Sequence, residues 1–178
     1  MRLETIQDLL LDQLKDIYSA ETQLTKALPK LVRRVKNSSV KHALEEHLKE
    51  TEKQVERLQT IQQSLGVKLS GKKCKAMEGL IEEGSEALHA DGNEDVIDLL
   101  TVAGCQRIEH YEISAYETAI SLAENLGFDE VADLLQENLQ EEEAAEEKLS
   151  EISFSEFLER SDTELIEEEE DEFETAAT

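Results

Sequence analysis

Apolar residues recur every three or four positions along most of the chain, a spacing that places them on one face of an α-helix. The spacing predicts long helices over residues 5–36, from a polar break at 37–39 to residue 65, over 94–125 and over 129–151, with a short helix over 77–90. Pro29 lies inside the first of these segments, and it removes one helical hydrogen bond. We therefore expect a kink there, or a restart of the helix just after Leu28.

The breaks between the long segments predict how the helices are arranged. The first two long helices are separated by two or three residues and the last two by a break at Gly127, so each pair must run antiparallel. A longer bridge, which contains the short helix, joins the two hairpins. These features predict an all-α fold, a ferritin-like antiparallel four-helix bundle with one long crossover, over residues 1–160. A short C-terminal helix is expected around Ile152–Leu158, and the acidic composition of residues 161–178 predicts a disordered tail.

The amino-acid composition further limits the functions and cellular locations that the protein can have. The 43 Asp and Glu residues outnumber the 18 Lys and Arg residues, which gives a net charge of −25 and argues against nucleic-acid binding. No apolar run resembles a signal peptide or a membrane span, so a cytoplasmic protein without membrane contact is expected. Cys74 and Cys105 have no CxxC or CxxH companion, which indicates reduced thiols rather than a zinc site.

Each long helix carries polar residues where its apolar stripe should continue. These positions are Glu21 in the first helix, His47, Glu50 and Gln54 in the second, Glu109 in the third, and Glu142 and Glu146 in the fourth. At about 1.5 Å of rise per residue, one carboxylate from each helix falls near the middle of the bundle. Converging buried anions need a compensating charge, and carboxylates with amide or nitrogen ligands suit iron or manganese. The pattern thus predicts two divalent metal ions.

A second interpretation assigns these glutamates to solvated helix faces. Glu is abundant in the chain, and its long side chain can reach water from the edge of a stripe. The protein would then be a metal-free acidic helical module that recruits a basic partner or keeps itself soluble under osmotic stress. Metal content per chain separates the two interpretations.

Five segments resemble the YciE/YciF family of bacterial ferritin-like proteins. They are YSAETQLTKALPK at 18–30, EHLKETEKQVERL at 46–58, CKAMEGLIEE at 74–83, QRIEHYEISAY at 106–116 and LQENLQEEEAAEEKL at 135–149. The resemblance implies a dimetal centre and a role in stress responses. We expect a homodimer or small homo-oligomer rather than a large storage cage. The resemblance also implies metal ligands at Glu21, Glu50, Gln54, Glu109, Glu142 and Glu146, with His47, His110 and Glu112 as supporting or alternate ligands.

One feature departs from the wider ferritin-like pattern. Di-iron bundles carry Glu-x-x-His on two helices, whereas Lys53 follows Glu50 by three positions here and Ala145 follows Glu142. The missing imidazoles leave open whether the centre performs peroxide or oxygen chemistry, and whether the protein is an enzyme. His47, three residues before Glu50, offers a nitrogen ligand from the opposite direction.

Overall fold

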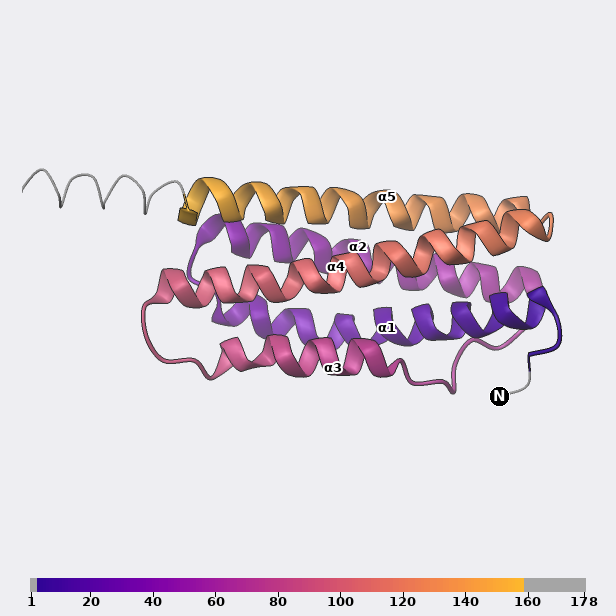
Figure 1. Cartoon of the computed structure of the whole chain (residues 1–178), viewed down its shortest axis with the longest axis horizontal. Helices are drawn as coiled ribbons and strands as arrows, with labels where there is room; N and C mark the ends of the chain where they lie inside the picture. Colours follow the sequence, from indigo (N-terminus) through magenta and orange to yellow (C-terminus); the bar gives the residue numbers. More distant parts are fainter. Residues whose placement is uncertain (1–2, 159–178) are drawn as a thin grey trace, which may run out of the picture.

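The chain folds into four long helices joined by one crossover, and the computed structural model describes residues 3–158, apart from the side chains of Phe154 and Glu156 (Figure 1). The long helices are α1 (Ile6–Arg34), α2 (Ser38–Leu65), α4 (Glu94–Asn125) and α5 (Asp129–Ile152). The crossover carries α3 (Lys75–Gly84) and a 3-10 turn, η1 (Ser85–Leu88), while η2 (Ser153–Leu158) continues α5 as a π-helix. The residues described contain no strand, and the predicted ferritin-like bundle is confirmed.

The arrangement of the helices follows from the two hairpins. The α1–α2 and α4–α5 hairpins lie side by side, with α1 against α4 and α2 against α5. The short helix α3 packs on the outside, against α1 and α4. None of the helices between residues 3 and 158 combines the length and the hydropathy that a membrane span requires. The predicted acidic tail at 161–178 lies outside the described residues.

Local signals explain where the helices begin and end. Thr5 and Asp8 form a reciprocal capping box at the start of α1, and the side chain of Asn37 accepts hydrogen bonds from the first turn of α2. Gly66 ends α2 in the left-handed conformation, with φ of 63°. The helix α1 continues through Pro29, so the predicted restart after Leu28 does not occur.

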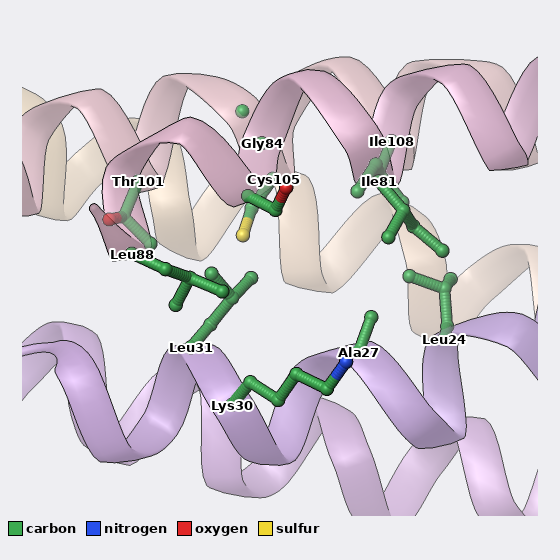
Figure 2. Close-up of a pocket in the computed structure, with 12 residues that line it drawn as sticks. Leu24, Ala27, Lys30, Leu31, Ile81, Gly84, Leu88, Thr101, Cys105 and Ile108 are labelled. Atoms are coloured by element: carbon green, nitrogen blue, oxygen red, sulfur yellow. The ribbon is translucent and has the colours of Figure 1, made fainter. Parts of the chain in front are cut away.

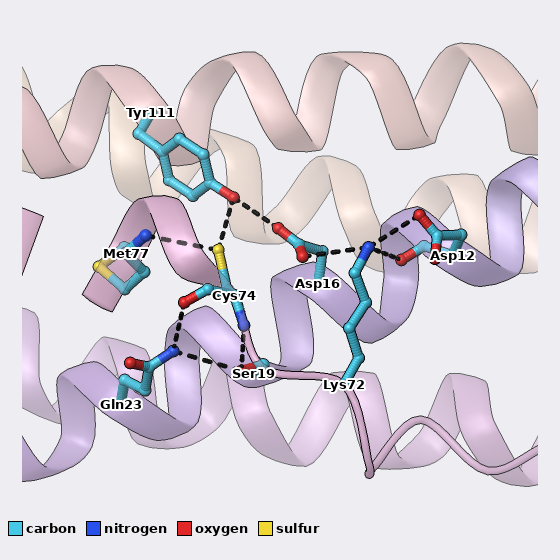
Figure 3. Close-up of polar contacts among 8 residues, drawn as sticks. All are labelled: Asp12, Asp16, Ser19, Gln23, Lys72, Cys74, Met77 and Tyr111. Atoms are coloured by element: carbon cyan, nitrogen blue, oxygen red, sulfur yellow. Dashed lines mark hydrogen bonds and ion pairs between the residues drawn. The ribbon is translucent and has the colours of Figure 1, made fainter. Parts of the chain in front are cut away.

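The helix α3 begins two residues earlier than predicted because Cys74 caps it. The Cys74 thiol accepts a hydrogen bond from the Met77 backbone N–H and lies 2.9 Å from the Tyr111 hydroxyl group, which donates to Asp16 (Figure 3). The Lys72 ammonium group pairs with Asp16 at 3.1 Å and also contacts Asp12. These contacts fasten the crossover to α1 and α4.

Two apolar clusters fill the bundle on either side of a polar layer. One cluster surrounds Leu24 and Leu28 of α1, and the other surrounds Leu10 and Leu14 of the same helix. Between them lie buried polar side chains from all four long helices: Glu21, His47, Thr51, Gln54, Glu109, Glu112, Asn138 and Glu142. The middle of the bundle is therefore where its chemistry concentrates.

Candidate metal centre

Four residues from three helices meet in this polar layer. They are His47 on α2, Glu109 and Glu112 on α4, and Glu142 on α5. Each offers one nitrogen or oxygen atom that lies within 4.8 Å of those of the other three, and none of the four is more than 4% exposed. Glu109 and Glu112 share one helix face because they are three residues apart.

The His47 side chain on α2 is close to carboxyl groups on both α4 and α5. Its Nε2 atom is 3.3 Å from Oε1 of Glu109, and its Nδ1 atom is 3.8 Å from Oε2 of Glu142. Neither ring nitrogen forms a hydrogen bond with any described residue, and the same is true of both carboxylate oxygens of Glu109, Glu112 and Glu142. Buried polar atoms without partners are costly, and these four side chains together could hold a metal ion.

Burial alters the protonation of these groups in the absence of such an ion. It raises the pKa of Glu109 to about 8, helped by the charge of Glu21. The pKa values of Glu112 and Glu142 also rise well above their usual range because both carboxyl groups are buried among other acids. Burial lowers the pKa of His47 to about 4, so its imidazole is neutral at pH 7. A bound cation would instead favour the ionised carboxylates and use the nitrogen lone pair of the neutral ring.

Glu21 and Gln54 border the group of four and are fully buried. Neither polar atom of the Gln54 amide has a hydrogen-bond partner among residues 3–158, nor does Oε2 of Glu21. The other Glu21 oxygen accepts a hydrogen bond from the hydroxyl group of Tyr116. The pKa of Glu21 rises because the carboxyl group is buried and because Glu142 is near.

A hydrogen-bond network connects Glu21 to the surface. The Tyr116 hydroxyl group accepts a hydrogen bond of 2.9 Å from Nδ2 of Asn138, and Oδ1 of Asn138 accepts one of 3.0 Å from Arg57. Arg57 also binds both carboxylate oxygens of Glu141, at 2.7 and 2.8 Å. The network fixes the position of one side of the polar layer.

The remaining predicted ligands lie at the edge of the layer. Glu50 is half-buried, and so is Glu146, which is 3.5 Å from the Gln106 amide nitrogen and 3.7 Å from Nε2 of His110. The His110 side chain is 68% exposed. The structure thus groups Glu109 and Glu142 with the two supporting candidates His47 and Glu112, and it leaves Glu50, Glu146 and His110 outside that group.

The sequence pattern predicted no role for Asn138 or for the hydroxyl group of Tyr116, which belong to the buried hydrogen-bond network. A signal for Asn138 existed, since it lies four residues before Glu142 and so on the same helix face. Glu112 was expected only as a supporting or alternate ligand, yet it belongs to the group of four. In the fold Glu112 is buried and Ile113 is only half-buried.

The helix arrangement and the buried carboxylates define a ferritin-like four-helix protein. A family model described as "Domain of unknown function (DUF892)" matches residues 5–161, and the chain belongs to this family. The chain is 42% identical over 156 residues to Protein YciF of Escherichia coli K12, which covers 87% of this chain and 94% of YciF. The resemblance to the YciE/YciF family is therefore confirmed.

Solved structures agree with this assignment. The crystal structure of the E. coli stress protein YciF matches with a TM-score of 0.83 over 85% of this chain and 96% of that chain, at 42% identity. YcfI of Rhodopseudomonas palustris matches with a TM-score of 0.80 at 46% identity, over 83% of this chain and 94% of that one. A protein of Xanthomonas campestris pv. campestris, at 22% identity and a TM-score of 0.69, shares the fold.

Proposed function

We propose that the protein binds two divalent metal ions, iron or manganese, in the middle of its bundle and acts in stress protection. The observation that carries this proposal is the set of buried polar atoms without partners on His47, Glu109, Glu112 and Glu142. Carboxylate oxygens with a neutral imidazole form a donor set that suits either metal. The stress role is suggested by the E. coli protein, which is described as a stress protein.

The second ion accounts for the polar atoms beside this group. Glu21 and Gln54 contribute further buried atoms without partners, and together with Glu109 and Glu142 they would hold this ion. Glu50 and Glu146, which are half-buried at the edge, would complete the coordination. His110 would support Glu146 from the surface.

Bound iron or manganese would supply redox chemistry toward peroxide or oxygen. The chain's own contribution is to hold the ligands in a layer closed on both sides by apolar clusters. The hydrogen bond from Tyr116 orients Glu21. Peroxide consumption that falls to background in Glu142→Ala, with helicity unchanged, would support an enzymatic role, while equal turnover in the variant would rule it out.

Metal analysis tests the proposal directly. Protein purified without chelator and incubated anaerobically with Fe(II) or Mn(II) should retain about two equivalents of metal per chain. Glu142→Ala should lose most of this metal, whereas Glu143→Ala, an exposed neighbour on α5, should keep it. Wild-type protein that retains only traces of metal would refute the proposal and favour the metal-free acidic module.

A further inference from the structure

A pocket between α2 and α5 borders the candidate metal centre at His47. Its volume is about 200 Å³. Ala43 on α2 and Ala144 and Ala145 on α5 line it, and these small side chains leave the gap between the two helices. Ala145 occupies the position where the Glu-x-x-His pattern would place an imidazole, so the missing histidine leaves this space open.

His47 connects the pocket to the buried layer. Its side chain lines the pocket, is only 4% exposed and has no hydrogen-bond partner among the described residues. The same imidazole is 3.3 Å from Glu109 and 3.8 Å from Glu142. A ligand that reaches the inner end of the pocket therefore meets a ring that also contacts the metal-binding group.

The charges around the pocket favour a cation. Glu46 and Glu50 contribute two carboxyl groups, and Lys148 contributes one ammonium group, which forms an ion pair with Glu46. This leaves an excess of acidic groups in a concave site, an arrangement that concentrates cations. A cavity of this kind holds one water for roughly every 10–15 Å³, so a pocket of about 200 Å³ accommodates a divalent ion with six waters.

We propose that this pocket is the entrance through which hydrated divalent cations reach the group formed by His47, Glu109, Glu112 and Glu142. Glu46 and Glu50 are the carboxylates that the ion meets in the pocket. Lys148 slows the passage of the ion because it competes with the ion for Glu46. The inference rests on the proposed function, since it assigns a route to the same metal centre.

A second pocket supplies the control. It lies between α1, α3 and α4 and is lined mainly by apolar side chains, among them Leu24, Leu31 and Ile81 (Figure 2). An apolar passage does not admit a hydrated ion, because the ion would lose its water without gaining ligands. Ala27, which lines this pocket, is half-buried like Ala145. Ala27→Leu and Ala145→Leu therefore form a matched pair.

Stopped-flow absorbance with Co(II) as the probe tests the route. In Ala145→Leu we expect the rate of Co(II) binding to fall by about tenfold or more, with the amount bound at equilibrium unchanged. Ala27→Leu should bind at the wild-type rate. Ala144→Met, a change at an exposed position that lines the pocket, should also slow binding and provides a second test if Ala145→Leu fails to fold.

A substitution of Lys148 tests the same route independently, because it changes the charge of the pocket. Lys148→Gln should bind Co(II) about two- to threefold faster at low salt, and the gain should shrink as salt increases. Lys26→Gln, which removes one exposed positive charge on α1, should leave the rate unchanged.

The outcomes separate the two proposals. The proposed entrance would be wrong if Ala145→Leu and Ala144→Met both bound Co(II) at the wild-type rate. It would also be wrong if Ala27→Leu slowed binding equally. In either case the proposed metal centre would stand, provided that Co(II) still binds at equilibrium. Absence of Co(II) binding in the wild-type protein at equilibrium would overturn both the entrance and the metal centre.

Discussion

Tyr116 on α4 donates a hydrogen bond from its hydroxyl group to the carboxyl group of Glu21 on α1, in the middle of the bundle. Both side chains are fully buried. The same hydroxyl group accepts a hydrogen bond from Asn138 on α5. One phenol oxygen therefore links three of the four long helices at the level of the candidate metal centre.

Tyr116→Phe should destabilise the metal-free protein by about 1–3 kcal/mol, because it leaves buried groups of Glu21 and Asn138 without their partner. Urea unfolding followed by circular dichroism measures the change. Tyr18→Phe is the control: Tyr18 is only half-buried, and its hydroxyl group has no hydrogen bond to the described residues. An equal loss in both variants would show that the buried hydrogen bonds contribute little.

The buried carboxyl groups should make the metal-free protein less stable as the pH rises. Burial raises the pKa of Glu109 from 4.5 to about 8, so between these values the folded chain keeps a proton that the unfolded chain has released. Glu112 and Glu142 shift in the same direction for the same reason. The free energy of unfolding should therefore fall by roughly 1 kcal/mol per pH unit for each such proton.

His47 contributes in the opposite direction, but at lower pH. Burial lowers its pKa from 6.5 to about 4, so its contribution to stability increases with pH only up to about 6.5. Urea unfolding of chelator-treated protein at pH 6.5 and pH 8 thus isolates the carboxyl groups. Added Mn(II) should reverse the trend, because metal binding releases the protons. Metal-free protein that is more stable at pH 8 would contradict the expected protonation.

Glu142→Gln should separate the contribution of Glu142 to metal binding from its contribution to the stability of the metal-free protein. Glutamine is neutral in both the folded and the unfolded chain, so the variant avoids the proton uptake that folding imposes on Glu142 above pH 4.5. We expect the metal-free variant to be about 1–3 kcal/mol more stable than wild type at pH 7.5 and to gain no stability from Mn(II). Glu143→Gln, at an exposed position, should change neither quantity. If the Glu142 carboxyl group instead stabilised the fold, the metal-free Glu142→Gln variant would be less stable than wild type, and this result would contradict the prediction.

The sequence predicted the fold because helix periodicity and chain breaks are local properties. Apolar spacing located the four long helices, and the breaks at 37–39 and Gly127 determined the hairpins. The start of α3 was not predictable in the same way, because a cysteine is an unusual cap and the contacts of Cys74 with Tyr111 come from a distant part of the chain.

The candidate site was predictable only in part. An interrupted stripe shows which helix face is polar, and this led to Glu21, Gln54, Glu109 and Glu142, all of which are fully buried. The stripe does not determine how far each helix is rotated about its axis. Glu50 therefore lies half-exposed at the edge, and the partners of each side chain depend on packing between helices.

Asp98 on α4 forms hydrogen bonds that hold the two hairpins together. One oxygen of this fully buried carboxylate accepts hydrogen bonds from the backbone N–H groups of Lys36, at 2.9 Å, and Asn37, at 2.6 Å. The contact holds the α1–α2 turn against the first part of α4. Asp98 is about three helical turns from Glu109, so it supports the bundle without touching the candidate metal centre.

Asp98→Ala should destabilise the protein by about 1–3 kcal/mol, because two backbone donors in the α1–α2 turn lose their acceptor. Asp98→Asn should lose less stability than Asp98→Ala, since its amide oxygen can still accept a hydrogen bond. Asp95→Ala, an exposed aspartate in the first turn of α4, should lose well under 1 kcal/mol. Urea unfolding gives these differences, and metal content per folded chain should stay at the wild-type value in all three variants. An Asp98→Ala protein as stable as Asp95→Ala would show that the turn is held by helix packing rather than by this carboxylate.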